Sequence, residues 1–375
     1  MTDARFARPQ RVVVKVGSSS LRAADGGLDR DLAVDLVDQL VGLRAAGGQV
    51  VLVSSGAVAA GLAPLGLPAR PADLPTQQAA ASVGQGILVH TYQARFAEHG
   101  LACGQVLLTP TDVVDRVRYL NARHTFTRLL ELGAVPVVNE NDTVATDELR
   151  FGDNDRLAAL VASMLHATLL VLLSDVEGLY PVRPLEAVVP APPLDRVDDF
   201  AALDPQLIGP AGSDVGTGGM ASKVEAARIA TFSGAHAVIA NARTPGVLER
   251  IVAGQHVGTW FPPSRRRPES RKLWIAFAPL PQGRIFVDEG AVAALTRRGS
   301  SLLAAGILDA HGDFGPGDAV DVVGPDHVVV ARGLTTYAVQ DVQQIRGRST
   351  ESLQSEFGLA YTREVIHRDS LVVVV

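Results

Sequence analysis

The chain has 375 residues, 34 basic and 40 acidic side chains and a formal net charge of −6, so it is long enough for two domains. The negative charge argues against nucleic-acid binding through a general basic field, and a single cysteine, Cys103, excludes a disulfide framework and a cysteine-rich metal site. No apolar segment behind Met1 is long enough for a signal peptide or a membrane span, so we expect a cytoplasmic protein.

The first third of the chain predicts strands that end in small or polar residues. Arg11–Val16 is a predicted buried strand that runs into Gly17-Ser-Ser-Ser20, where backbone N–H groups can approach an anion beside Lys15. Gln49–Ser54 is the next predicted strand, and Ser55 opens a short helix that offers further N–H groups and a hydroxyl. The other elements expected here are a helix over Asp29–Ala46, a long or broken helix over Pro75–His99, a strand near Leu101–Leu108, a polar hairpin arm over Thr109–Arg118 and a helix near Tyr119–Leu132.

A dense polar stretch, Asn139–Asp155, follows between a predicted strand, Gly133–Val138, and a predicted helix, Arg156–His166. It holds three of the five asparagines of the chain, together with six Asp and Glu residues. Mixed Asn and Asp side chains suit the binding of an ammonium group and of lysines, whereas a merely solvated loop would need only charge. Because ligands bind at the carboxyl ends of strands in open α/β sheets, this stretch is the first candidate for a ligand site.

The same alternation continues to about residue 262. A fully apolar strand, Thr168–Leu173, ends in Ser174-Asp175, and a glycine-rich loop, Gly212–Lys223, leads into a predicted helix over Val224–Ser233. A strand over Ala235–Ala240 and a short helix over Val247–Ala253 complete this part. We therefore predict an α/β fold with a mainly parallel sheet sandwiched by helices.

A change of composition near Pro262 indicates a domain boundary. We expect a first domain over residues 1–262, a polar, proline-punctuated linker over 263–275, and a small β-rich domain with a C-terminal tail over 276–375. The short β-like runs of the last part are Arg284–Val287, Ala319–Val323 and Val328–Ala331.

Lysine is rare in this chain, which has three lysines, Lys15, Lys223 and Lys272, and 31 arginines. Where arginine supplies almost every positive charge, a remaining lysine is a candidate for a site that needs a compact ammonium group. Lys15 and Lys223 lie in loops of small residues, off the apolar faces of the predicted elements, whereas Lys272 lies in the linker. Two such loops and an acidic stretch suit phosphoryl transfer from a nucleotide with Mg²⁺. Neither the GxxxxGK[ST] pattern nor a GxGxxG after a strand is present.

Several short motifs resemble those of the amino acid kinase family, and in particular its branch that phosphorylates the side-chain carboxylate of glutamate in proline biosynthesis. These motifs are Lys15-Val-Gly-Ser-Ser19, Ser54-Ser-Gly-Ala57, Asn139-Glu-Asn-Asp142, Gly152-Asp-Asn-Asp155, Ser174-Asp175, Gly178-Leu-Tyr180 and Gly216-Thr-Gly-Gly-Met-Ala-Ser-Lys223. The segments Val287-Asp-Glu-Gly-Ala291, Gly299-Ser-Ser-Leu-Leu303 and Val330-Ala-Arg-Gly-Leu334 resemble a PUA domain. Family members often continue the GLY motif with Asp-Pro-Arg, whereas this chain has Tyr180-Pro-Val-Arg-Pro.

The resemblance implies a role for each candidate residue. Lys15 and Lys223 would clamp the transferring phosphoryl group, and Asp155 would orient both lysines. The substrate-binding residues that it implies are Ser55, Asp142, Asn154 and Asp153. The ATP-binding residues that it implies are Lys15, Ser174, Asp175, Thr217, Gly218, Gly219, Met220, Ala221, Ser222 and Lys223. ATP would be the co-substrate and Mg²⁺ would accompany it, with no protein side chain assigned as a metal ligand.

The resemblance also implies partners. The expected substrates are L-glutamate and ATP, in a homo-oligomer that is a dimer or a tetramer, and the labile acyl-phosphate product would pass to a glutamyl phosphate reductase. The alternatives are a family member that acts on acetylglutamate, aspartate or carbamate, or an RNA-binding protein with a PUA domain. RNA is the weaker alternative, because residues 276–375 contain eight Arg, no Lys and twelve Asp or Glu, a net charge of −4.

Overall fold

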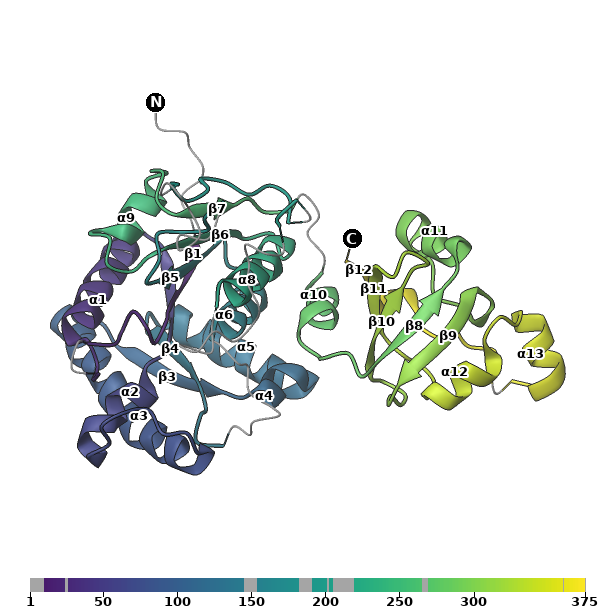
Figure 1. Cartoon of the computed structure of the whole chain (residues 1–375), viewed down its shortest axis with the longest axis horizontal. Helices are drawn as coiled ribbons and strands as arrows, with labels where there is room; N and C mark the ends of the chain where they lie inside the picture. The colour runs from purple at the N-terminus through teal and green to yellow at the C-terminus, as the bar shows by residue number, and fades with distance from the viewer. Residues whose placement is uncertain are drawn as a thin grey trace. The chain divides into compact units, whose positions relative to one another are not determined.

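The computed structural model describes residues 10–23, 26–144, 154–181, 191–200, 202–204, 219–264, 269–359 and 361–374. The chain divides into two compact units, Met1–Arg267 and Pro268–Val375 (Figure 1). Each unit has its own sheet and its own apolar core.

The first unit is built on a seven-stranded sheet in the order β3-β4-β2-β1-β5-β6-β7. Its strands are β1 (Arg11–Val16), β2 (Gln49–Ser54), β3 (Cys103–Leu108), β4 (Val135–Glu140), β5 (Leu169–Ser174), β6 (His236–Asn241) and β7 (Thr259–Phe261). All neighbouring strands are parallel except β6 and β7. Because parallel strands end at the same edge of a sheet, the loops that follow β1, β2, β4 and β5 meet there.

Helices cover both faces of this sheet, as Figure 1 shows. One face shares an apolar core with α1 (Arg30–Ala45), α3 (Leu74–Glu98) and α9 (Val247–Val252). The other face is covered by α5 (Arg116–Glu131), α6 (Asn154–Met164) and α8 (Met220–Phe232). The predicted class, a mainly parallel sheet sandwiched by helices, is confirmed.

The alternation of side chains along β1 decides where Lys15 lies. Val12, Val14 and Val16 belong to the core that the sheet shares with α1 and α3. Successive side chains of a strand point to opposite faces, so Lys15 points to the face beneath α6 and α8. A lysine between two buried valines therefore reaches the first turns of two helices.

Helix α3 is continuous, which settles the choice between a long and a broken helix. It crosses α2 (Ala57–Leu62), which leads into the 3₁₀ turn η1 (Ala63–Leu65). A Cβ atom on Gly84 would lie 1.8 Å from the carbonyl oxygen of Ala57, and one on Gly61 would lie 1.9 Å from that of Ala80. Only glycine allows so close a crossing, and the crossing holds α3 against the segment that follows β2.

The predicted hairpin arm over Thr109–Arg118 is wrong, because this segment forms α4 (Pro110–Val114) and the start of α5. The Thr109 side chain accepts a hydrogen bond from the Asp112 backbone, while the Asp112 carboxylate accepts one from the Thr109 backbone. This reciprocal capping, with Pro110 in the first helical position, starts a helix. Local capping chemistry therefore outweighed the polar composition that suggested an exposed arm.

Three predicted boundaries also move at the carboxyl edge of the sheet. Asn139 and Glu140 are the last residues of β4 and pair with β3, although they are polar. Helix α6 begins at Asn154 instead of Arg156, and α8 begins at Met220 instead of Val224. Residues expected in loops are therefore held by regular backbone structure. Strand β7 was not predicted, because three residues are too few to show a period.

The second unit contains a five-stranded sheet in the order β12-β11-β10-β8-β9. The predicted strand runs are confirmed as β8, β10 and β11, and the unit has additional helices and strands. Its elements are α10 (Ser270–Phe277), β8 (Gly283–Val287), α11 (Glu289–Arg298), η3 (Ala304–Gly306), β9 (Ile307–Gly312), β10 (Ala319–Val323), β11 (Val329–Leu334), α12 (Val339–Ile345), α13 (Thr350–Phe357), η4 (Arg368–Ser370) and β12 (Leu371–Val373).

Helix α10 occupies part of the stretch that was expected to be a linker. Ile275 is fully buried, and the helix packs on β11 and β12. Arg332 donates a hydrogen bond to the carbonyl oxygen of Ala276 at 2.7 Å and pairs with Asp321 at 2.8 Å. From residue 270 onwards this stretch is therefore part of the second unit, because its apolar side chains complete that unit's packing.

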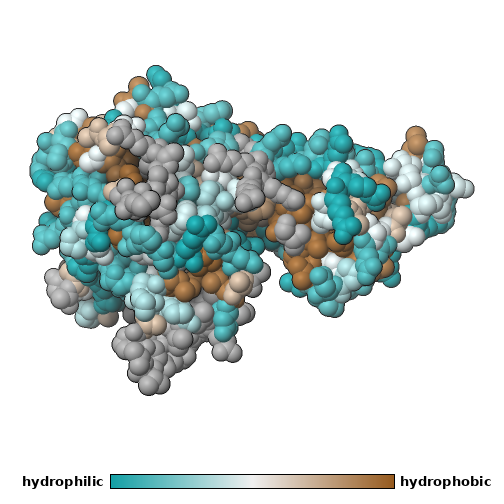
Figure 2. All heavy atoms as spheres, turned by 90° about the horizontal axis from the view of Figure 1, so that it is seen from above, coloured by the Kyte–Doolittle hydropathy of each residue, from teal (hydrophilic) through white to brown (hydrophobic). Residues whose placement is uncertain are grey.

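The surface in Figure 2 is mostly hydrophilic, with hydrophobic patches on both units. Scattered apolar residues are ordinary on the surface of a folded protein. Within the described ranges, no helix combines the length and the apolar character that crossing a membrane requires.

Candidate active site

The carboxyl edge of the first sheet brings together most of the predicted site residues. Lys15 is the penultimate residue of β1, Ser55 follows β2, and Ser174 ends β5. The first turn of α6 adds Asn154 and Asp155, and the first turn of α8 adds Ser222 and Lys223. The residues come from five separate segments, and the parallel sheet is what aligns their ends.

Asp155 lies at the centre of a buried charged cluster. Its Oδ1 atom lies 2.5 Å from Lys15 Nζ, and its Oδ2 atom lies 3.1 Å from Lys223 Nζ. The Ser222 hydroxyl donates a further hydrogen bond to Oδ2 at 2.9 Å. The exposed fractions are 0% for Asp155, 1% for Lys15 and 6% for Lys223, so little water offsets these charges. One carboxylate between two ammonium groups leaves an excess of positive charge, which favours an anion at this place.

Small residues keep the space beside Lys15 open. Gly17 follows the strand, and a Cβ atom there would lie 3.5 Å from Lys15 Nζ. A longer side chain at position 17 would therefore fill the volume next to the ammonium group. The Gly17 N–H donates to the carbonyl oxygen of Leu173 at 3.3 Å, which ties the loop after β1 to the end of β5.

A chain of amide side chains lies next to this cluster. Asn154 Nδ2 donates to Ser55 Oγ at 2.9 Å and to Asn139 Oδ1 at 2.8 Å. Asn139 Nδ2 donates to Gln85 Oε1 at 2.8 Å. The chain therefore connects α6, the ends of β2 and β4, and α3. Asn139 was placed in the polar stretch of the sequence but was assigned no role. Gln85 was not identified as a site residue, because no motif or pattern surrounds it in the sequence.

Tyr92 provides a second link from α3 to the site. Its hydroxyl lies 2.8 Å from Ser54 Oγ, which donates to the carbonyl oxygen of Ser55 at 2.9 Å. Either hydroxyl can donate in this pair, and the Tyr92 hydroxyl can donate to Ser54 Oγ while Ser54 donates to that carbonyl. Burial raises the pKa of Tyr92 far above its ordinary value, which keeps this hydroxyl protonated. Tyr92 on α3 thus holds the Ser54-Ser55 segment in place.

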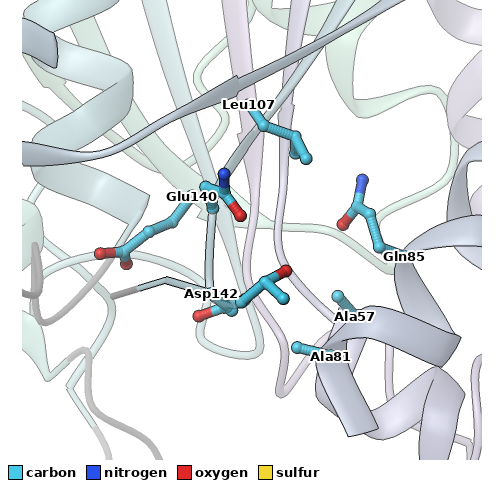
Figure 3. A pocket seen from close by; sticks show the side chains of 8 residues that line it. Ala57, Ala81, Gln85, Leu107, Glu140 and Asp142 are labelled. Carbon is cyan, nitrogen blue, oxygen red and sulfur yellow. The ribbon is translucent and has the colours of Figure 1, made fainter. Parts of the chain in front are cut away.

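A small pocket opens beside the amide chain, at the end of β4 (Figure 3). Gln85 and Asp142 contribute polar atoms to its wall, and Ala57 and Ala81 line it with methyl groups. The other lining residues are Leu107, Glu140, Asn141 and Thr143. An acidic residue in the lining of a small pocket, Asp142, favours a positively charged group.

The predicted nucleotide-binding residues are only partly described. Ser174 is buried at the end of β5 and donates to Asp175 Oδ1 at 3.0 Å, and Asp175 itself is exposed. Gly219 precedes α8, and Met220, Ala221, Ser222 and Lys223 form its first turn. The N-terminus of a helix offers N–H groups and a positive dipole end to phosphate. Three predicted residues, Asp153, Thr217 and Gly218, lie outside the described residues.

The motif Gly178-Leu-Tyr180 has a packing reason of its own. A Cβ atom on Gly178 would lie 2.7 Å from Thr259 Oγ1. The Leu179 N–H donates to this oxygen at 2.8 Å, and the Thr259 hydroxyl donates to the carbonyl oxygen of Leu194 at 2.6 Å. The glycine therefore lets the segment after β5 lie against β7.

Comparisons with known proteins show what this chain is similar to. The model of the amino acid kinase family matches residues 10–241, and the model of the PUA domain matches residues 283–356. The glutamate 5-kinase of Thermobifida fusca is 52% identical over 376 residues, covering 100% of this chain and 95% of that protein. The glutamate 5-kinase of Salinispora arenicola is 54% identical, covering 99% of each chain, and that of Streptomyces coelicolor is 52% identical, covering 97% and 96%. A solved structure of UMP kinase from Bacillus anthracis has 15% identity, a TM-score of 0.47 and coverage of 68% of this chain and 97% of its own.

Proposed function

This chain belongs to the amino acid kinase family, and from that premise we propose that it transfers the γ-phosphoryl group of ATP to the side-chain carboxylate of L-glutamate. The product is L-glutamyl 5-phosphate, and the reaction is the first step of proline biosynthesis. Relatives named glutamate 5-kinase, about half identical over nearly the whole chain, support this acceptor. The observation that carries the proposal is the buried cluster of Lys15, Asp155 and Lys223 at the carboxyl edge of the sheet.

The chemistry needs little from the protein beyond position and charge. A glutamate side chain has an unperturbed pKa of about 4.3, so its carboxylate is ionised near neutral pH and needs no general base. One carboxylate oxygen forms a bond to the γ-phosphorus while the bond from phosphorus to the bridging oxygen breaks, and ADP leaves with that electron pair. The main obstacle is repulsion between the carboxylate and the phosphate. Lys15 and Lys223 offset this repulsion, and Asp155 keeps their ammonium groups in place.

Substrate and nucleotide occupy the two sides of this cluster. Ser55, Asn154 and Asp142 hold glutamate on the side of the pocket in Figure 3. Asp153, which lies outside the described residues, is assigned to glutamate from the family resemblance alone. The N-terminal turn of α8 and the end of β5 hold ATP on the other side. The nucleotide-binding residues are Lys15, Ser174, Asp175, Thr217, Gly218, Gly219, Met220, Ala221, Ser222 and Lys223.

Mg²⁺ enters with the nucleotide. Among the described residues, no group of three or more His, Cys, Asp or Glu side chains could enclose a metal ion. Magnesium in kinases is held mainly by phosphate oxygens and water, with one or two carboxylates, so such an enclosure is not required. Bound to the phosphates, the ion would offset their negative charge.

The fate of the product and the assembly form part of the same proposal. An acyl phosphate hydrolyses readily, which favours its direct transfer to a glutamyl phosphate reductase. We also propose a homo-oligomer, a dimer or tetramer, located in the cytoplasm, where glutamate and ATP are available. Light scattering of the purified chain measures the assembly, and a monomer at micromolar concentration would contradict it.

The test of the activity is a panel of acids with ATP, Mg²⁺ and hydroxylamine, in which ADP and the trapped hydroxamate are measured. We expect both products with L-glutamate and neither with N-acetylglutamate or aspartate. The same panel includes carbamate, which is scored by ADP formation. Turnover with one of the other acids alone would reassign the substrate within the family, and no hydroxamate or ADP with any acid would refute a carboxylate kinase.

A further inference from the structure

The direction of the amide chain is imposed by two backbone groups. Asn139 Oδ1 accepts from the Glu140 backbone N–H at 2.9 Å. A backbone N–H can only donate, so the atom of Asn139 that faces it must be the oxygen. This oxygen also lies 2.8 Å from the Asn154 amide, which must therefore present its NH₂ group.

The carbonyl of Ser54 imposes the same direction from the other side. It lies 3.4 Å from Asn154 Nδ2, and a carbonyl oxygen can only accept. With its NH₂ group directed at these acceptors, Asn154 turns its Oδ1 atom the other way. Asn154 is 9% exposed, and within the described part of the chain Oδ1 is buried with no hydrogen-bond partner. A buried acceptor in this state attracts a donor from a ligand.

Gln85 fixes the remaining end of the chain. Its Oε1 atom accepts from Asn139 Nδ2 at 2.8 Å, so the Asn139 amide is held on both its oxygen and its nitrogen. Gln85 lies on α3, directly after Gly84, at the close crossing with α2. It also lines the pocket that contains Asp142 (Figure 3). A rigid helix therefore holds the outer end of the chain.

We propose that Gln85 is a positioning residue for recognition of the substrate's amino group. By accepting from Asn139 Nδ2, it holds Asn139 in the orientation that the Glu140 N–H sets, and in that arrangement Asn154 Oδ1 accepts a hydrogen bond from the ammonium group of the bound amino acid. The neighbouring Asp142 supplies the matching negative charge in the pocket lining. This role rests on the proposed function, because it assumes an amino acid as the ligand. Gln85 itself need not touch the reacting atoms.

The test compares a substitution that removes the acceptor at position 85 with one that keeps an acceptor and adds a negative charge. Gln85→Met keeps the length and helix propensity of the side chain but removes the acceptor, whereas Gln85→Glu keeps an acceptor for Asn139 Nδ2. We expect Gln85→Met to raise the KM for glutamate at least about tenfold, with kcat and the KM for ATP within about twofold of the original chain. Gln85→Glu should stay within about threefold for all three constants.

Gln77→Met is the matched control, because Gln77 lies on the same helix and donates its hydrogen bond to the Pro71 carbonyl oxygen instead of to the site. It should leave all three constants unchanged. Circular dichroism checks folding, and Gln85→Ala replaces Gln85→Met if the latter does not fold, with the same expected result.

Three outcomes would overturn the role of Gln85. These are an unchanged KM for glutamate in Gln85→Met, equal losses in Gln85→Met and Gln85→Glu, and a loss shared by kcat and the KM for ATP. The original chain is assayed alongside with L-glutamate. If it shows no glutamate-dependent turnover, the proposed function fails, which is a different result from active variants with unchanged constants.

Discussion

Asp155→Asn should destabilise the first unit, because it removes the carboxylate that pairs with two buried ammonium groups, those of Lys15 and Lys223. Lys15 Nζ lies 2.5 Å from one carboxylate oxygen and Lys223 Nζ lies 3.1 Å from the other, with both lysines at most 6% exposed. Asparagine has the same shape but no charge, and its NH₂ group would face one of the two ammonium groups. Water cannot reach the lysines well enough to compensate.

The size of the effect follows from the burial. Removing one partner of a buried ion pair typically costs about 3–5 kcal/mol, because an uncompensated charge stays inside the protein. For a unit of this size, each kcal/mol lowers the melting temperature by roughly 2–4 °C, so we expect a decrease of about 6 °C or more. An ATP analogue that resists hydrolysis, added with Mg²⁺, should recover more stability in the variant than in the original chain, because phosphate restores the missing negative charge.

Tryptophan fluorescence can follow this unit alone. The chain has two tryptophans, and Trp260 lies in β7 of the first unit whereas Trp274 lies in α10 of the second. In a Trp274→Phe background, thermal melting monitored by Trp260 reports the first unit at a fixed protein concentration. The signal is compared with and without the nucleotide analogue.

Asp38→Asn is the matched control. Asp38 also joins two basic side chains, Arg95 at 2.7 Å and His99 at 2.8 Å, but it is 37% exposed. The hydrogen-bonded Arg95 holds the pKa of this carboxyl below its usual range, yet an exposed pair contributes only about 0–1 kcal/mol. A melting temperature of Asp155→Asn that matches that of Asp38→Asn would refute the argument that burial makes the central carboxylate essential.

Three further predictions test the assigned roles. Lys15→Arg and Lys223→Arg should each lower kcat at least about a hundredfold, which corresponds to roughly 2.7 kcal/mol of barrier. Lys272→Arg is the control and should turn over normally. Near-normal rates in the first two variants would mean that positive charge alone suffices. Asp142→Ala should raise the KM for glutamate far more than the KM for ATP, and the reverse pattern in steady-state kinetics would move Asp142 to the nucleotide side. A chain that ends at Arg267 should keep kinase turnover, because all assigned residues precede it, and a folded but inactive product would show that the second unit helps to build the site.

The burial of the lysines changes one expectation about folding. From the sequence, Lys15 and Lys223 lie off any apolar face, and arginine at these positions should leave folding nearly unchanged. In the structure both are buried, and Lys15 lies within a strand between valines. A larger guanidinium group there should also lower stability, by about 1–3 kcal/mol for overpacking, which the melting assay measures.

The sequence by itself determined those features that depend on neighbouring residues. The apolar runs of β1, β2 and β5 identify buried strands, because both faces of a parallel strand must be covered. The scarcity of lysine pointed to Lys15 and Lys223, and their common pairing with Asp155 shows that these residues do meet. Their individual roles in the reaction stay predictions.

Only the tertiary structure decided which distant residues complete the site. Gln85 and Tyr92 lie 54 and 38 residues from their hydrogen-bond partners, Asn139 and Ser54, and no local pattern records such a contact. Asn139 became a strand residue because β3 pairs with it, which outweighs its polar character. Local periodicity reports which side of an element is buried, whereas the partner that a buried polar group finds depends on how the helices pack across the sheet.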